Sequence, residues 1–185
     1  MSVDFEKVAS ERMQKSLAAL KKDMGTVRAG RATPALLDKI TVEYYGTPTP
    51  LSQMASITAP EPRQLVIQPW DKNTIHDIEK ALLKSDLGLT PSNDGIVIRL
   101  SVPQLTEERR HELTKVIRKM AEEGRIAVRN VRRDINEEIK KAEKQSSLSE
   151  DESRRLQERI QDVTDKTVAE VDRVLAQKER ELMEV

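Results

Sequence analysis

The sequence contains no cysteine, which excludes disulfide bonds and thiolate metal sites. Aromatic residues make up only 2% of the 185 residues. The first residues have neither the basic start nor the continuous apolar run of a signal peptide, and no segment is long and apolar enough to cross a bilayer. We therefore expect a cytoplasmic protein that makes no contact with membranes.

The formal net charge is zero, so overall electrostatics do not point to nucleic acid. Charged residues nevertheless make up 35% of the chain. Together with the scarcity of aromatics, this composition favours long, solvent-exposed helices with narrow apolar seams over a thick globular core.

The distribution of proline divides the chain into a central region and two flanks. All eight prolines lie between positions 34 and 103, and the flanks contain none. Proline lacks an amide donor and clashes with the preceding helical turn, so it excludes a long helix where it recurs. Residues 31–104 also hold only 15 of the 64 charged side chains. The pattern predicts one domain formed by residues 1–30 plus 105–185, with residues 31–104 inserted into it. The eight prolines are Pro34, Pro48, Pro50, Pro60, Pro62, Pro69, Pro91 and Pro103.

The two flanks carry apolar residues at alternating spacings of three and four, which places them on one face of a helix. Three helices are predicted, and they form an antiparallel bundle. The first stripe is Met13, Leu17, Leu20, Met24 and Val27. The second is Leu113, Ile117, Met120, Gly124, Val128, Val131, Ile135, Ile139 and Ala142. The third is Leu156, Ile160, Val163, Thr167, Val171 and Val174.

Capping residues mark where these helices begin. Thr106 precedes two acidic residues and is expected to cap the second helix, which would span roughly 106–145 and about 58 Å at 1.5 Å per residue. The polar segment 145–149 is typical of a short turn, with Ser149 as the next cap. A short turn makes the second and third helices antiparallel neighbours, so the bundle should be elongated.

The insert is predicted to be a small β/α/β domain, which makes the fold class α+β. Thr33 and Pro34 are expected to begin a short helix, and strands are expected at 40–45, 65–67 and 96–100. A helix is expected within 71–86, with Ile75, Ile78 and Leu82 on its buried face. Residues 91–95 are expected to form a turn.

Catalytic patterns are absent. His76 and His111 each lie in an amphipathic helix among polar residues, where histidines are usually surface residues. No phosphate loop, dinucleotide fingerprint or metalloprotease spacing occurs. We expect no catalytic residues, metal, cofactor or small-molecule substrate. A small hydrolase in the insert remains a minor hypothesis.

Arginines gather in the second helix. Residues 124–133 contain Arg125, Arg129, Arg132 and Arg133 and no acid, and the first three are spaced to share a face. Arginine pairs with phosphate through a planar fork, so the stripe is compatible with RNA backbone binding. The alternative is a solvated face paired with acids of the third helix. Those acids are Glu158, Asp162 and Asp165.

The crossings between the two domains contain a glycine on one side and a proline on the other. Gly30 lies between Arg28 and Arg31, a second basic point, and Pro103 lies on the return crossing. Two short crossings of this kind form either a hinge or a rigid elbow, and the sequence is compatible with both.

Four separated motifs carry a resemblance to the ribosome recycling factor family. They are RAGRATPALL at 28–37 followed by VEYYG at 42–46, SDLGLTP at 85–91, QLTEERR at 104–110 and VRNVRRD at 128–134. Their order and the chain length are similar to those of the family, and together the motifs are specific to it. The region around Trp70 and most of the third helix carry little of this signature.

The resemblance implies an L-shaped, tRNA-like molecule that binds the large ribosomal subunit. With elongation factor G and GTP, such proteins split post-termination ribosomes and release mRNA and tRNA, and they are not themselves enzymes. Bundle arginines of the family contact ribosomal RNA, which implies that role for Arg129, Arg132 and Arg133. The other candidate RNA-binding residues are Arg125, Arg28 and Arg31. The implied hinge comprises Ala29, Gly30, Val102, Pro103, Gln104 and Leu105.

A helical interaction scaffold with no ribosomal role is the alternative function. Apolar stripes alone are compatible with it, because exposed stripes pair helices of different chains. A scaffold of this kind would self-associate, whereas a closed three-helix bundle should be a monomer, which is the state we expect.

Overall fold

The computed structural model describes residues 4–184, which divide into two compact units. One unit comprises the described residues up to Ala29 and from Thr106 onward, and it is helical. The other unit, Gly30–Leu105, contains all of the β-strands. The fold class is therefore α+β, and each boundary differs by one residue from the division at 1–30, 31–104 and 105–185. Below, the two units are called the bundle and the insert.

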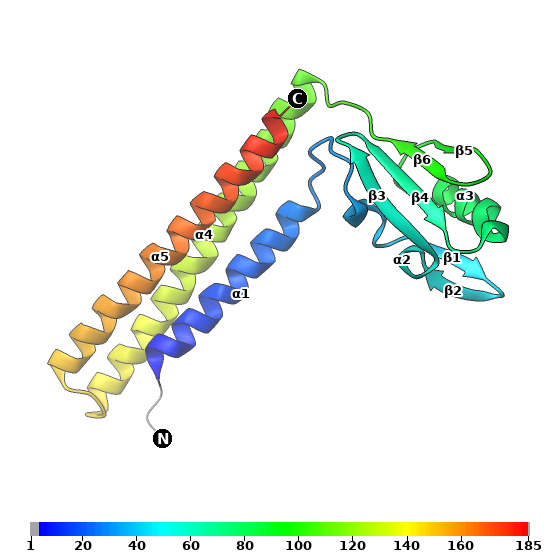
Figure 1. The fold of residues 1–185 in the computed structure, drawn as a ribbon. Helices are drawn as coiled ribbons and strands as arrows, with labels where there is room; N and C mark the ends of the chain where they lie inside the picture. The colour runs from blue at the N-terminus through cyan, green and yellow to red at the C-terminus, as the bar shows by residue number, and fades with distance from the viewer. Residues whose placement is uncertain (1–3, 185) are drawn as a thin grey trace. The chain divides into compact units, whose positions relative to one another are not determined.

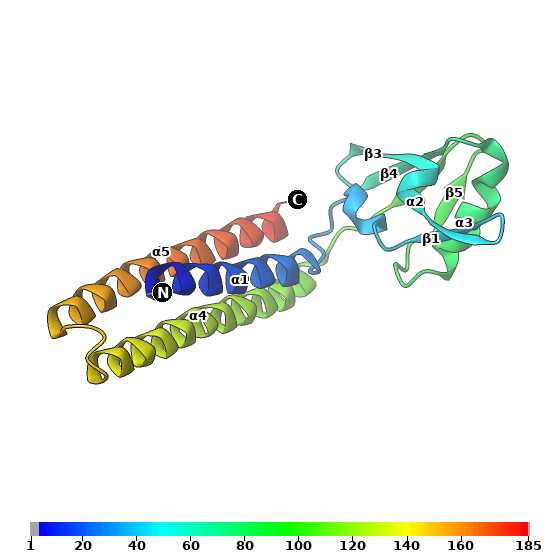
Figure 2. The same cartoon turned by 90° about the horizontal axis from the view of Figure 1, so that it is seen from below.

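Three long helices form the bundle: α1 (Phe5–Gly25), α4 (Glu107–Lys144) and α5 (Glu150–Met183). Each packs against the other two, and Figures 1 and 2 show them side by side from two directions. The 38 residues of α4 span about 57 Å at 1.5 Å per residue. The turn before Glu150 makes α4 and α5 antiparallel, as the sequence predicts.

The predicted caps of α4 and α5 are confirmed. Thr106 accepts a hydrogen bond from the backbone N–H of Arg109 at 3.1 Å. Ser149 accepts from the N–H of Glu152 at 3.2 Å, and the Glu152 carboxylate accepts from the Ser149 N–H at 2.8 Å. Each bond satisfies a donor that the first helical turn would otherwise leave unpaired.

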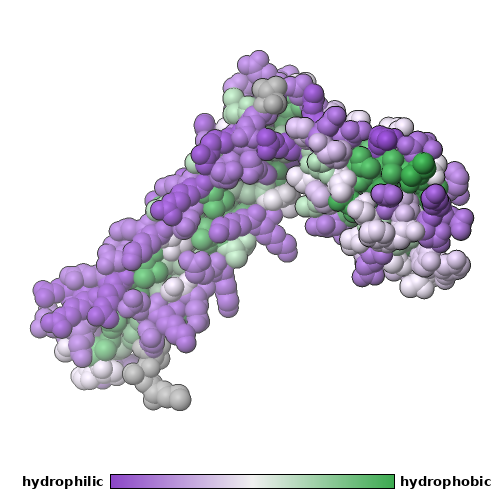
Figure 3. Space-filling view, in the orientation of Figure 1, coloured by the Kyte–Doolittle hydropathy of each residue, from purple (hydrophilic) through white to green (hydrophobic). Residues whose placement is uncertain are grey.

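The bundle core is the seam where the three predicted apolar stripes meet. Most stripe positions are buried, among them Met13, Ile135 and Ile160 at 0% exposure. Gly124 lies where α1 crosses α4, and a Cβ at this position would be 3.0 Å from Leu20 Cδ2. On the visible face, Figure 3 shows hydrophilic residues over most of the bundle and hydrophobic ones in the grooves between helices. The apolar stripes of the three helices are thus mostly buried against one another.

The insert contains a β-hairpin, a four-stranded sheet and a helix. The hairpin is β1 (Thr41–Tyr44) and β2 (Thr47–Pro50). The antiparallel sheet has the order β3-β4-β6-β5. Its strands are β3 (Ala55–Glu61), β4 (Gln64–Pro69), β5 (Pro91–Asn93) and β6 (Ile98–Ser101). Helix α3 (Ile75–Lys84) packs on β1 and β5. Short helices are η1 (Pro34–Leu37), α2 (Leu51–Met54) and η2 (Lys72–Thr74).

The insert has a core of its own. Ile75, Ile78 and Leu82 of α3 are buried as predicted, and they belong to the same apolar cluster as Leu65 and Ile67 of the central strand β4. The cluster lies within the insert and contains no residue of α1, α4 or α5. Each unit therefore has the apolar interior that independent stability requires.

Several predictions for the insert are wrong in detail. Residues 91–93 form strand β5 and not a turn, and β6 begins at Ile98, which leaves Ile96 56% exposed. Strands β2 and β3 were not predicted, because they contain prolines. Both lie at the edge of a sheet, where a missing N–H leaves no ladder bond unmade. Thr33 precedes η1 as expected, but its side chain makes no capping hydrogen bond.

Candidate nucleic-acid interface

The four arginines of residues 124–133, which lie in α4, divide into two groups according to the contacts they make. Arg129 and Arg133 point to solvent: the Arg129 side chain is 52% exposed, with only a loose ion pair to Glu122 at 3.9 Å. Arg133 is exposed and forms no ion pair or hydrogen bond within residues 4–184. Both guanidinium groups are available to a ligand.

Arg125 belongs to the second group, which borders α5. Its Nη2 and Nε donate to Asp172 Oδ1 at 2.7 and 2.9 Å, and its Nη1 donates to Glu122 at 3.0 Å. Hydrogen bonding to Asp172 raises the pKa of Arg125 above its ordinary value. The side chain is 20% exposed. For this residue the internal-pairing alternative applies, although its partner on α5 is Asp172 and not one of the three acids considered from the sequence.

Arg132 also borders α5, but its partner is neutral. Arg132 Nη1 donates to Gln161 Oε1 at 2.6 Å, and Gln161 Nε2 donates to Asp165 Oδ1 at 2.8 Å. None of the described acids forms an ion pair with Arg132. It is therefore held in place while its charge stays largely uncompensated.

A recess of about 320 Å³ opens on this side of α4, and we call it the arginine recess. Two buried polar atoms of its lining residues, Arg132 Nε and Asn136 Oδ1, have no hydrogen-bond partner among the described residues. Such atoms are costly unless water or a ligand satisfies them. The recess is lined by Arg129, Asn130, Arg132, Arg133, Asn136, Glu137 and Lys140.

The arginine recess is positively charged in total. Four of its lining residues are cationic and one, Glu137, is acidic. Lys140 and Asn136 were not singled out from the sequence, although the spacing of three and four that links the arginines continues to both of them. Gln161 and Asp172 could not be found in this way, because they lie on another helix.

The predicted hinge residues at the crossings lie mostly in the insert. Val102 N–H donates to the carbonyl of Arg63 at 2.8 Å, and Arg63 Nη1 donates to Gln104 Oε1 at 3.1 Å. Gly30 has a φ of +74°, and a Cβ there would be 3.1 Å from Leu105 Cγ. Because a side chain at this φ is strained, glycine is required.

Arg28 belongs to the bundle and Arg31 to the insert. The structure therefore places the two on opposite sides of the boundary, and neither lines the arginine recess.

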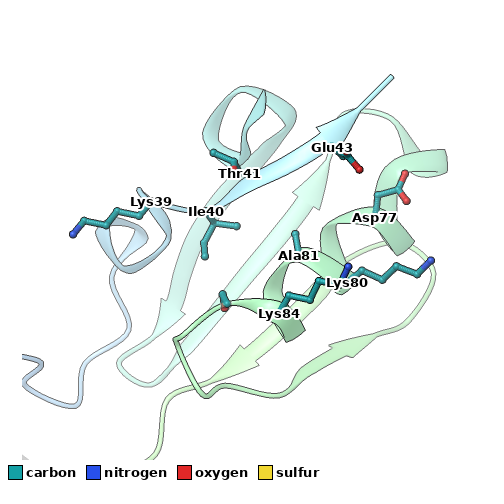
Figure 4. Close-up of a pocket in the computed structure, with 9 residues that line it drawn as sticks. Lys39, Ile40, Thr41, Glu43, Asp77, Lys80, Ala81 and Lys84 are labelled. Carbon is teal, nitrogen blue, oxygen red and sulfur yellow. The ribbon is translucent and has the colours of Figure 1, made fainter. Parts of the chain in front are cut away.

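The insert has a groove of about 380 Å³ between β1 and α3 (Figure 4). It is lined by charges of both signs, and the side chains of Lys39 and Lys80 point in opposite directions. His76 is not among the lining residues, and its side chain is 80% exposed with Glu79 at 3.9 Å. Within residues 4–184 no three histidine or acidic side chains are placed to hold a metal ion. Nothing in the insert supports the hydrolase hypothesis.

Comparisons with known proteins agree with the motifs. Residues 20–183 match the family described as ribosome recycling factor. The chain belongs to the ribosome recycling factor family. The family's member from Brevibacillus brevis is 58% identical over 175 residues, covering 95% of both chains. The Bacillus subtilis member is 56% identical over the full length of both.

Solved structures of the family share the fold. A solution structure of the ribosome recycling factor matches with a TM-score of 0.78 at 43% identity, covering 98% of this chain and 97% of the other. A second match is the T. thermophilus ribosome recycling factor, in a structure with E. coli elongation factor G bound to the E. coli post-termination complex. Its TM-score is 0.64 at 46% identity, with 98% of both chains covered.

None of the helices within residues 4–184 has the length and apolarity needed to span a membrane.

Proposed function

We propose that this chain recycles ribosomes: together with elongation factor G and GTP it splits the post-termination ribosome into subunits, and mRNA and tRNA are released. Similarity over the full chain to named family members supports this role, as does a solved relative that was placed with elongation factor G on a post-termination complex. In this proposal the chain hydrolyses nothing itself and acts as a monomer in the cytoplasm.

The arginine recess is the observation that supports RNA contact most directly. Its cationic side chains lie on one face of a long helix, and Arg129 and Arg133 are exposed. Phosphates of ribosomal RNA are spaced along a backbone, and guanidinium groups pair with them through two parallel hydrogen bonds. We propose that this face binds RNA of the large subunit. Arg125 contributes less, because its guanidinium already donates hydrogen bonds to Asp172 and Glu122.

Binding to purified large subunits tests the site. Arg132→Ala should weaken binding about five- to thirtyfold, because a guanidinium–phosphate contact contributes roughly 1–2 kcal/mol. The salt dependence of binding should also become shallower by about one unit of slope. Arg173→Ala is the matched control: it removes one exposed arginine of α5, ion-paired to Glu170 at 3.1 Å, and should bind normally.

Subunit separation tests the function. Light scattering of post-termination ribosomes should fall when the wild-type chain, elongation factor G and GTP are all present, and it should not fall when any one is omitted. If the complete mixture leaves the ribosomes intact, recycling is not the function. Unchanged large-subunit affinity in both Arg129→Ala and Arg132→Ala would remove the arginine recess from the interface.

We propose further that the crossings act as a hinge, centred on Ala29 and Gly30 in one crossing and Leu105 in the other. Val102 and Gln104 are bonded to Arg63, so they would move with the insert. Gly30→Ala should strain the crossing and slow subunit separation while large-subunit binding stays unchanged. Equal rates of separation for the variant and the wild type would favour the rigid elbow.

The structure does not favour the alternative hypothesis of a helical interaction scaffold. It depends on apolar stripes that remain available to another chain, and the stripes of α1, α4 and α5 are packed together. Sedimentation velocity distinguishes the two hypotheses, because a scaffold would self-associate with rising concentration while the proposed monomer would not.

A further inference from the structure

Arg132 is oriented by a chain of hydrogen bonds that crosses from α4 to α5. The Gln161 amide accepts from Arg132 Nη1 at 2.6 Å and donates to Asp165 Oδ1 at 2.8 Å. The carboxylate can only accept and the guanidinium can only donate, so a single orientation of the amide satisfies both partners. Gln161 is thereby fixed, and it fixes Arg132 in turn.

The neutrality of this partner separates Arg132 from Arg125, which lies two turns earlier on the same helix. Arg125 is clamped by two carboxylates, so much of its charge is compensated before any ligand arrives. A carboxylate at position 161 would do the same to Arg132, because it would place a full opposite charge beside the guanidinium, whereas the glutamine amide places none there. A glutamine holds the guanidinium in place without neutralising it.

The arrangement also determines which part of Arg132 is left for a ligand. Nη1 is occupied by Gln161, and Nε is buried without a partner. Nη2 makes no hydrogen bond to any of the described residues, and the side chain lines the arginine recess. An arginine with its long stem fixed loses less conformational entropy on binding than a free one does.

We infer that Gln161 is a positioning residue for RNA binding: it orients Arg132 toward the arginine recess and, being uncharged, preserves the attraction of Arg132 for phosphate. This inference rests on the proposed function, because it needs the arginine recess to bind ribosomal RNA.

Two substitutions of Gln161 separate orientation from charge. Gln161→Leu removes the hold on Arg132, and Gln161→Glu keeps a hold but pairs the guanidinium with a carboxylate. Each should weaken binding to purified large subunits about three- to tenfold, which corresponds to roughly 0.7–1.4 kcal/mol. Gln161→Glu gives up the bond to Asp165 and gains an ion pair with Arg132, so the helix content by circular dichroism should stay that of the wild type. The salt dependence of its binding should become shallower, which a purely structural role would not produce.

A matched control lies one turn earlier on α5. Gln157 is half-buried like Gln161, but it donates to Ser153 of its own helix at 3.2 Å, so Gln157→Leu should bind normally. A double-mutant cycle then tests whether Gln161 acts through Arg132. In the Arg132→Ala background, the uncharged Gln161→Leu should have no further effect on binding.

Two results would overturn the inference: wild-type affinity in Gln161→Glu, or a loss in Gln161→Leu that persists when Arg132 is absent. These results differ from a failure of the proposed function. If the wild-type chain does not bind large subunits, or if neither Arg129→Ala nor Arg132→Ala weakens binding, the proposed site itself fails. If Arg132→Ala weakens binding and the Gln161 variants do not, only the positioning role is wrong.

Discussion

The bundle and the insert bury similar aliphatic residues, but they bring them together by different means. In the bundle, one stripe on each of three helices meets along a seam, and neighbours on a stripe are three or four residues apart. In the insert, the core joins residues as distant as Leu37 and Leu100, which lie on η1 and β6. Periodicity along the chain therefore describes the bundle well, whereas the insert depends on which strands pair.

Backbone constraints differ in the same way. The described bundle has no proline and one mid-helix glycine, Gly124, at a close helix crossing. The insert holds all eight prolines and three glycines with positive φ outside the Gly30 crossing. Irregular backbone is thus concentrated in the insert, whereas the proposed RNA-binding face lies on α4, a continuous helix.

Because the bundle and the insert have separate cores, we expect each unit to unfold independently of the other. Of the differences between the two units, this one should have the largest effect. Ile135 and Ile67 are both at 0% exposure, one in each core. Changing either to Ala should lower the free energy of unfolding of its own unit by about 2–5 kcal/mol. Circular dichroism in urea reports mainly on the bundle helices, and fluorescence of Trp70, the single tryptophan, reports on the insert.

In Ile135→Ala the circular dichroism midpoint should fall while the Trp70 midpoint stays in place, and Ile67→Ala should show the reverse. Each variant serves as the control for the other. If both probes shift together in both variants, the two units unfold as one cooperative structure and the comparison fails.

Two glycines of the bundle should respond in opposite directions, with a smaller effect. Gly124→Ile would force a branched side chain against Leu20 and should cost about 1–3 kcal/mol. Gly25, the last residue of α1, has nothing within 4 Å of an added Cβ. Gly25→Ala should therefore stabilise the bundle slightly, by up to about 1 kcal/mol. Urea midpoints measure both, and equal effects would show that the α1–α4 crossing does not require a glycine.

The smallest effect concerns pH and distinguishes the insert from the bundle. Asp94 accepts backbone N–H bonds from Val97 and Ile96 and a guanidinium bond from Arg99, which together lower its pKa to about 2. Because the folded pKa lies below the unfolded one, Asp94 stabilises the insert above about pH 4, and the contribution is lost as pH falls toward 2.

Asp94→Asn should flatten this part of the pH dependence of the Trp70 transition and leave the circular dichroism of the bundle unaffected. A carboxyl titration followed by NMR should give a midpoint near 2 for Asp94. An ordinary midpoint, or an identical pH dependence in the wild type and Asp94→Asn, would contradict the assignment.

The sequence predicts the bundle closely and the insert partly. Caps at Thr106 and Ser149 are local, since the hydroxyl and the amide it satisfies lie three residues apart. Strands β2, β3 and β5 escape prediction because their prolines argue against a strand in the middle of a sheet. All three lie at a sheet edge, and which strand lies at an edge is a property of the assembled sheet. For the candidate site, spacing along α4 groups the arginines but leaves open which of them carry a partner.

By itself the sequence determined the family, the three-helix seam, the interruption by a proline-rich insert and the arginine-rich segment of α4. Each of these features follows from the types of residue present and from their spacing over a few positions. Only the tertiary structure decided that Arg125 faces the carboxylate of Asp172 while Arg132 faces the neutral amide of Gln161. That difference depends on the register of two helices packed in opposite directions, which the spacing of residues within either helix does not specify.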